Sequence, residues 1–210
     1  SQLVDGLGGR PRVMDTGLKL HACCRYNQSA IDATLAVMKE HTLSAADVEK
    51  IQVHIFKAAY PLVLDPWEEK MNPQTDVQAQ FSLPYTVAAA AVKGRVSFDE
   101  FDATVLNDST VRGMMQRVEA VYDPDLDPLF PKRWPTRVAI RTTDGRSLEH
   151  RVDFPKGDVE NPLTWKELVD RFRDHSGNVF TPEKQTKIVE AVNGLQAVDS
   201  IAALTTLLGK

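Results

Sequence analysis

The clearest pattern of apolar and polar positions lies in residues 136–154, where two alternating runs flank Asp144 and Gly145. Alternation with a period of two is typical of a half-buried strand, and an Asp-Gly pair between two such runs indicates a type I′ turn. This segment is therefore predicted to form an antiparallel hairpin. Another strand is predicted around residues 51–55, whose apolar side chains would share one face.

Residues 16–22 alternate in the same way. Leu18 and Leu20 would point to one face of a strand, while Lys19 and His21 would point to the other. The segment is therefore predicted to be a half-buried strand.

From about Ala30 onward, apolar residues recur at helical spacing, which predicts a helix of roughly three turns. Ser29 and Asp32 resemble a capping box at its start. Because predicted strands stand on both sides of this helix, the order strand, helix, strand indicates a crossover unit.

A second helix is predicted over residues 83–93. Ser82 is its expected N-cap, Pro84 stands in the first turn, where a missing N–H is harmless, and Gly94 is its expected stop. The remaining predictions are an irregular loop from Ala58 to Gln78, a helix from Ser109 to Val121, and three C-terminal helices that begin at Thr164, at Thr181, and at Asp199 or Ser200.

Together these elements predict an α+β fold, in which several helices pack on a small mixed or antiparallel sheet of about four strands. No linker composition divides the sequence, so residues 1–210 are expected to form a single domain. The net charge of −4 argues against a nucleic-acid partner. No apolar stretch of the sequence is long enough to span a membrane and no signal peptide opens it, so a cytoplasmic location is expected.

Two adjacent cysteines, Cys23 and Cys24, exclude a disulfide framework. Metal ligands at zinc-like spacing and glycine-rich nucleotide motifs are absent from the sequence, so neither a metal nor an organic cofactor is implied. Cys24, beside Arg25 at a predicted helix start, is either a nucleophile or the more common buried, inert cysteine. Ser82 is better explained as a helix cap than as a nucleophile.

Three other residues are candidates for binding or converting an anion. Lys19, on the polar face of its predicted strand, either forms part of a carboxylate clamp or lies exposed to solvent. Tyr85, in the first turn of its helix, either hydrogen-bonds or protonates a bound acid or is simply packed. His21 shares the face of Lys19 and could act as an acid or base, although a single histidine in a strand is usually structural.

Four segments of the sequence form an ordered set: TGLKLHACCRYNQSAIDA, AQFSLPYTVAAAAVKG, FPKGDVENPLTWKELVDRF and ALTTLLGK. In this order and spacing they resemble the C-terminal domain of the MmgE/PrpD family over nearly the whole chain. That family includes 2-methylcitrate dehydratase, cis-aconitate decarboxylase and iminodisuccinate epimerase. The resemblance implies an enzyme that acts without cofactor on small di- or tricarboxylates, by removing a proton next to a carboxylate.

The resemblance also implies roles for individual residues. Lys19 and Tyr85 match the family's active-site lysine and tyrosine and are the expected catalytic residues. Cys24 and Arg25 are expected to bind substrate, and His21 is kept with them from its place on the Lys19 face. The helical N-terminal domain of the family is expected to be missing from this chain and to hold the other half of the site, and the whole protein is expected to be a homodimer.

Gln28 departs from the histidine that is common in this family motif, which argues against a histidine-dependent activity at that position. The segment Lys156 to Asp158 is a family landmark that is interpreted as a structural turn. The function expected from the resemblance is a lyase like 2-methylcitrate dehydratase, with an epimerase or a decarboxylase in the same fold as alternatives. A hypothesis of another class is a catalytically silent assembly module, because this chain supplies only half of the expected site.

Overall fold

The computed structural model describes residues 4–197 and 200–209, and its chain divides into two compact units, Ser1–Pro162 and Leu163–Lys210. The strands are β1 (Val48–Ile55), β2 (Val118–Tyr122), β3 (Thr136–Thr142) and β4 (Ser147–Val152). The α-helices are α1 (Gln28–Glu40), α2 (Tyr60–Val63), α3 (Trp67–Lys70), α4 (Asp76–Gln80), α5 (Leu83–Lys93), α6 (Ala103–Leu106), α7 (Ser109–Met115), α8 (Trp165–Ser176), α9 (Pro182–Asn193) and α10 (Ile201–Leu208). Short 3₁₀ turns lie at Arg12–Asp15, Arg25–Asn27, Ala45–Asp47, Lys57–Ala59, Asp99–Phe101, Pro124–Leu129 and Leu195–Ala197.

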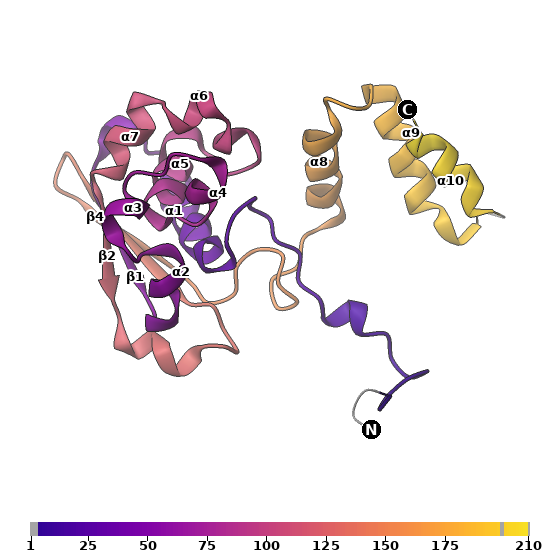
Figure 1. Cartoon of the computed structure of the whole chain (residues 1–210), viewed down its shortest axis with the longest axis horizontal. Helices are drawn as coiled ribbons and strands as arrows, with labels where there is room; N and C mark the ends of the chain where they lie inside the picture. Colours follow the sequence, from indigo (N-terminus) through magenta and orange to yellow (C-terminus); the bar gives the residue numbers. More distant parts are fainter. Residues whose placement is uncertain (1–3, 198–199, 210) are drawn as a thin grey trace. The chain divides into compact units, whose positions relative to one another are not determined.

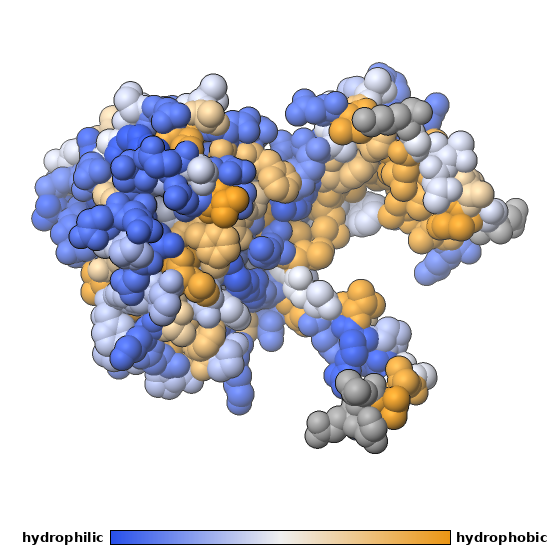
Figure 2. Space-filling model, viewed as in Figure 1, coloured by the Kyte–Doolittle hydropathy of each residue, from blue (hydrophilic) through white to orange (hydrophobic). Residues whose placement is uncertain are grey.

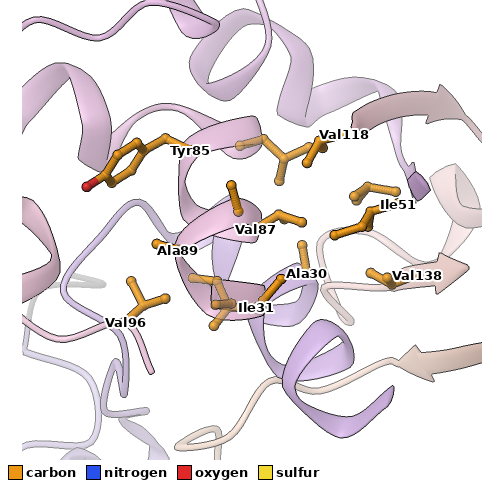
Figure 3. Packing of buried hydrophobic residues seen from close by; sticks show 14 of the residues in the cluster. Ala30, Ile31, Ile51, Tyr85, Val87, Ala89, Val96, Val118 and Val138 are labelled. Atoms are coloured by element: carbon orange, nitrogen blue, oxygen red, sulfur yellow. The ribbon is translucent and has the colours of Figure 1, made fainter. Parts of the chain in front are cut away.

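The sheet of the first unit, whose strands β1, β2 and β4 are labelled in Figure 1, has the strand order β2-β1-β3-β4. β1 and β2 are parallel, whereas the β1–β3 and β3–β4 pairs are antiparallel, so the sheet is mixed. Alternate residues of β1 and β3 are fully buried against α1 and α5, as Figure 3 shows for Ile51 and Val138. The predicted α+β fold with a small mixed sheet is confirmed.

Helix α5 has the predicted limits. The Ser82 hydroxyl accepts a hydrogen bond from the Tyr85 N–H at 3.1 Å, and Gly94 ends the helix with a φ of +70°. Its four consecutive alanines are buried, and the helix packs against both α1 and α7. Small side chains allow packed helices to approach closely. α5 also contacts the 3₁₀ turn Arg25–Asn27 that leads into α1, and Arg25 of this turn belongs to the candidate site.

The strand predicted for residues 16–22 is wrong. The Leu18 N–H donates to the Gly157 carbonyl at 2.8 Å, but residues 20–23 form a bend. At His21 the Gln28 side chain replaces a strand partner, because its Oε1 accepts from the His21 N–H and its Nε2 donates to the His21 carbonyl, both at 3.0 Å. Without this strand the predicted crossover unit does not form, and the parallel pair of the described chain is β1 with β2.

The helix predicted from Ser109 to Val121 is correct only in its first half. α7 ends at Met115, and the chain returns as β2 from Val118, with Val118 opposite Ile51 of β1. The valines of this segment have stiff, branched side chains that suit a strand once a partner strand is present. Tertiary pairing therefore overrides the helical spacing that the sequence shows.

Two connections also differ from expectation. The segment from Ala58 to Gln78 was predicted as a loop, but it contains α2, α3 and the start of α4, which are too short to give a periodic pattern. The β3–β4 hairpin is confirmed, but its turn is not type I′. The Thr142 N–H donates to the Arg146 carbonyl and closes a loop of residues 143–145, with Gly145 at a φ of +89°.

The second unit consists of α8, α9 and α10. Thr164 forms the predicted capping box with Glu167, Thr181 caps α9, and Ser200 caps α10; the alternative start, Asp199, lies outside the described residues. Hydrophobic side chains are exposed on these helices and their connections (Figure 2), among them Trp165, Val179, Val192, Leu195, Ile201 and Leu208. Within the described ranges no helix combines the length and the apolar character that crossing a membrane requires.

Candidate functional site

A concave site of about 470 Å³ in the first unit brings together three cationic side chains, those of Lys19, Arg25 and Lys132. Its other lining residues are Asp15, Gly17, Trp134, Asp158, Val159 and Glu160. The sequence predicted Lys19 and Arg25 as neighbours in a carboxylate pocket, and the structure places them in one cavity. Concave sites with a few convergent polar groups are typical of small-molecule binding.

Arg25 is the most constrained of the three cations. It begins the 3₁₀ turn that leads into α1, and its guanidinium donates to Oδ1 of Asp158. On another side its Cζ atom lies 4.9 Å from the centroid of the Trp134 ring, a cation–π contact. The side chain is still one-quarter exposed, and because a guanidinium has five N–H donors, some of its donors remain for an anion.

Trp134, whose ring contacts Arg25, belongs to a cluster of packed aromatic side chains. Its ring centroid lies 5.0 Å from that of Tyr26 and 5.2 Å from that of Phe130, and the Phe130 ring stacks on Phe56 at 4.8 Å. Such offset and edge-to-face contacts favour one arrangement of the rings. The position of the cation–π contact is therefore set by the core.

Lys19 and Lys132 differ from Arg25 in that no described carboxylate neutralises them. The Lys19 Nζ donates to the Cys23 carbonyl at 3.3 Å, a contact that orients the ammonium without neutralising it. Among residues 4–197 and 200–209, no carboxylate forms an ion pair with either lysine. Asp15 at the rim is paired with Arg10 at 2.7 Å. Of the three carboxylates in the lining, Asp158 is paired with Arg25 and Asp15 with Arg10, which leaves Glu160 as the one negative charge beside Lys19 and Lys132. An anionic ligand could therefore bind at the two lysines and at the remaining donors of Arg25.

His21 has a structural position beside this cavity. It is 5% exposed, and its Nε2 lies 2.9 Å from Oδ1 of Asp32. The other carboxylate oxygen of Asp32 accepts from the Lys156 N–H at 2.7 Å. His21 thus links the 20–23 bend to α1 and, through Asp32, to the segment that precedes Asp158. It does not belong to the cavity lining.

The capping box predicted for Ser29 and Asp32 does not form. The Ser29 hydroxyl donates to the Trp134 carbonyl, and Asp32 is engaged by His21 and Lys156. Serine and aspartate side chains can hydrogen-bond either to the N–H groups of a helix's first turn or to partners elsewhere in the chain. Here both side chains bond to other partners, which lie beside the site.

Both cysteines are buried, and neither belongs to the cavity lining. Burial raises the pKa of the Cys23 thiol well above its ordinary range, and the neighbouring Cys24 adds to the rise. The main chain of Cys24 donates to the Gln80 carbonyl at 2.9 Å, which fastens the bend to the end of α4. For Cys23 the geometry favours an inert, packed thiol. Substrate binding by Cys24 remains a prediction.

Tyr85 lies in the core and not in the cavity. It is fully buried, its hydroxyl donates to the Glu100 carbonyl, and its ring centroid is 5.9 Å from that of Phe101. Figure 3 shows the ring directed away from Ile51 and Val138 of the sheet. Burial raises the pKa of the phenol to about 12. The structure therefore does not bring Tyr85 together with Lys19 and Arg25.

The change Tyr85→Phe tests this placement. We expect a loss of about 1 to 2 kcal/mol in the free energy of unfolding, because the Glu100 carbonyl loses a buried donor. Turnover per folded molecule of the full-length protein should stay within about threefold of wild type. Urea unfolding and steady-state kinetics on the same preparation measure both. A strong fall in turnover at unchanged stability would assign the hydroxyl to the chemistry instead.

Among the cavity residues that sequence reasoning missed are Lys132, Trp134 and Asp158. Two of them stand in the run FPKRW and the third in PKGD, which was interpreted only as a turn. Basic and aromatic residues side by side were a usable signal for Lys132 and Trp134. For Asp158 the available signal was an acidic residue directly after a glycine at a tight turn.

In the described part of the chain, no three His, Cys, Asp or Glu side chains are grouped as a metal site requires.

Residues 21–197 match the family model described as the MmgE/PrpD C-terminal domain. Two curated relatives are named cis-aconitate decarboxylase. The protein of Mus musculus is 26% identical over 183 residues, 84% of this chain and 36% of the relative. The protein of Homo sapiens is 25% identical over 136 residues, 65% of this chain and 28% of the relative. The chain thus spans about a third of the length of these relatives.

Proposed function

Because the chain belongs to the MmgE/PrpD family, we propose that it is the carboxylate-binding part of a lyase for small di- or tricarboxylates. The observation that carries the proposal is the cavity in which Lys19 and Arg25 meet, with Lys132 beside them. The relatives are enzymes by name, which supports catalysis over a purely structural role.

The proposed reaction starts with removal of a proton from the carbon next to a carboxylate, without a cofactor. Such a proton is weakly acidic, so the developing negative charge needs fixed cations and hydrogen-bond donors. Arg25 offers a planar, already oriented guanidinium for one substrate carboxylate, and Lys19 offers a point charge beside it. Arg25 would hold the substrate by this carboxylate, and Lys19 would stabilise the developing charge.

The proposal concerns the full-length protein. We propose that a helical N-terminal domain supplies the remaining acid or base and that the protein works as a homodimer. The finer activity that we propose is a dehydratase like 2-methylcitrate dehydratase. A cis-aconitate decarboxylase is the second candidate, favoured by the names of the two relatives.

The test is turnover of 2-methylcitrate, cis-aconitate and iminodisuccinate by the full-length protein in deuterated water, followed by NMR. Loss of water from 2-methylcitrate supports the dehydratase, and release of CO₂ from cis-aconitate supports the decarboxylase. Exchange of deuterium into iminodisuccinate without loss of either group indicates an epimerase. A folded full-length protein with no turnover on all three would overturn the proposal in favour of an assembly module.

A further inference from the structure

The segment Lys156 to Asp158, interpreted from the sequence only as a turn, is fastened to the cavity from several sides. The Gly157 carbonyl accepts from the Leu18 N–H at 2.8 Å, and the Gly157 N–H donates to the Asn161 carbonyl at 2.8 Å. The Lys156 N–H donates to Asp32 in α1. These main-chain contacts leave the turn little freedom, so the side chain that follows Gly157 starts from a fixed point.

That side chain is Asp158, and its carboxylate is confined as well as buried. The side chain is 8% exposed and pairs with Arg25. A Cβ atom added to Gly17 would lie only 3.1 Å from Oδ1 of Asp158, so the main chain at residue 17 limits movement of the carboxylate. Asp158 therefore presents a fixed anionic partner to the guanidinium.

Asp158 is itself unsuited to contact an anionic substrate, because like charges repel. Its value to the site must come through Arg25. A free arginine side chain populates many rotamers, and ordering it on binding costs free energy. With Asp158 on one side and Trp134 on another, that ordering is complete before a ligand arrives.

We propose that Asp158 is the positioning residue of the site: it orients the Arg25 guanidinium so that the remaining donors face the cavity and receive one substrate carboxylate. This inference rests on the proposed function for the identity of the ligand. It gives the PKGD segment a role beyond a structural turn. The three cations then have different roles. Arg25 fixes the orientation of the bound carboxylate, and Lys19 and Lys132, which pair with no described carboxylate, supply positive charge around it.

The experiment compares Asp158→Asn and Asp158→Glu in the full-length protein, each alone and with Arg25→Ala. The matched control is Asp144→Asn, which removes an exposed carboxylate paired with Arg146 in the hairpin turn, outside the cavity. For Asp158→Asn we expect KM to rise by about three- to tenfold with kcat within about twofold, as for the loss of a group that binds substrate and transition state alike. Asp158→Glu, which restores the charge on a longer arm, should recover part of the loss. In the Arg25→Ala background neither change should raise KM further.

A second measurement does not depend on turnover. Phenylglyoxal modifies accessible guanidinium groups, and peptide mass spectrometry gives the rate for each arginine. Arg25 should react slowly in wild type and several times faster in Asp158→Asn, while Arg12, whose side chain is 91% exposed, serves as the internal reference. Labelling of Arg25 at the wild-type rate in a folded Asp158→Asn protein, or an equal rise in KM in the Arg25→Ala background, overturns the inference. Failure of the proposed function looks different, because wild type itself would then lack turnover.

Discussion

Replacing Gly157 by alanine is expected to lower the free energy of unfolding by about 2 to 5 kcal/mol. Two causes add at this position. Its φ of +97° is unfavourable for any residue with a Cβ, and an added Cβ would stand 1.9 Å from the Leu18 carbonyl oxygen. The main chain at Leu18 or at Gly157 must therefore move. Urea unfolding of the chain followed by tryptophan fluorescence measures the loss, since Trp134 lies in the neighbouring cavity wall.

Gly145 provides the matched control. It also has a positive φ, +89°, but an added Cβ would meet nothing within 4 Å. Gly145→Ala should therefore cost only about 1 kcal/mol from backbone strain. The difference between the two variants isolates the close approach of residues 157 and 18. Equal losses would show that the PKGD turn does not press against the segment that carries Lys19.

Where local signals agree with tertiary packing, the sequence predicts the fold well. Helix α5 has a capping serine, an early proline and a terminal glycine, and all three have their expected roles. The hairpin of β3 and β4 alternates in both strands, and its pairing is confirmed although its turn is one residue longer. In these elements a single conformation satisfies the backbone, the turn and the burial pattern at once.

Two of the errors, the strand predicted for residues 16–22 and the second half of the helix predicted for residues 109–121, come from partners that the local pattern does not reveal. Alternation in residues 16–22 has no neighbouring strand, because the Gln28 side chain occupies the main-chain groups of His21. Helical spacing at residues 118–121 yields to a ladder with β1. A pattern in one sequence cannot show which partner is close in space, so such segments are decided only by the assembled fold.

In the candidate site, too, the sequence pattern predicts some residues, whereas others are brought in only by the folded chain. Lys19 and Arg25 were found from a motif and meet in one cavity, whereas Asp158 lies 133 residues from Arg25 along the chain. Tyr85 was predicted as catalytic from the same kind of motif match, but its hydroxyl donates a hydrogen bond to the Glu100 carbonyl within the core. Of the residues matched by motif, Lys19 and Arg25 thus lie in one cavity and Tyr85 in the core, and only the contacts of the folded chain show this difference.

Replacing Lys19 by alanine in the full-length protein is expected to lower kcat/KM on its substrate by about 10²- to 10³-fold, which is typical for loss of one charge-stabilising group. The expectation rests on an ammonium that lines the cavity, is oriented by the Cys23 carbonyl and is not neutralised by a described carboxylate. Folding should be unaffected, because the side chain is exposed and makes this single polar contact among those described. Steady-state kinetics at saturating and limiting substrate measure the change.

The control is Lys39→Ala, which removes an exposed lysine near the end of α1, outside the cavity. It alters the net charge equally, so a general electrostatic effect on an anionic substrate would appear in both variants. Activity of Lys39→Ala should stay within about twofold of wild type. If Lys19→Ala kept more than about a tenth of the activity, the Lys19 ammonium would not stabilise the charge that develops in the transition state, and that role would fall to another group.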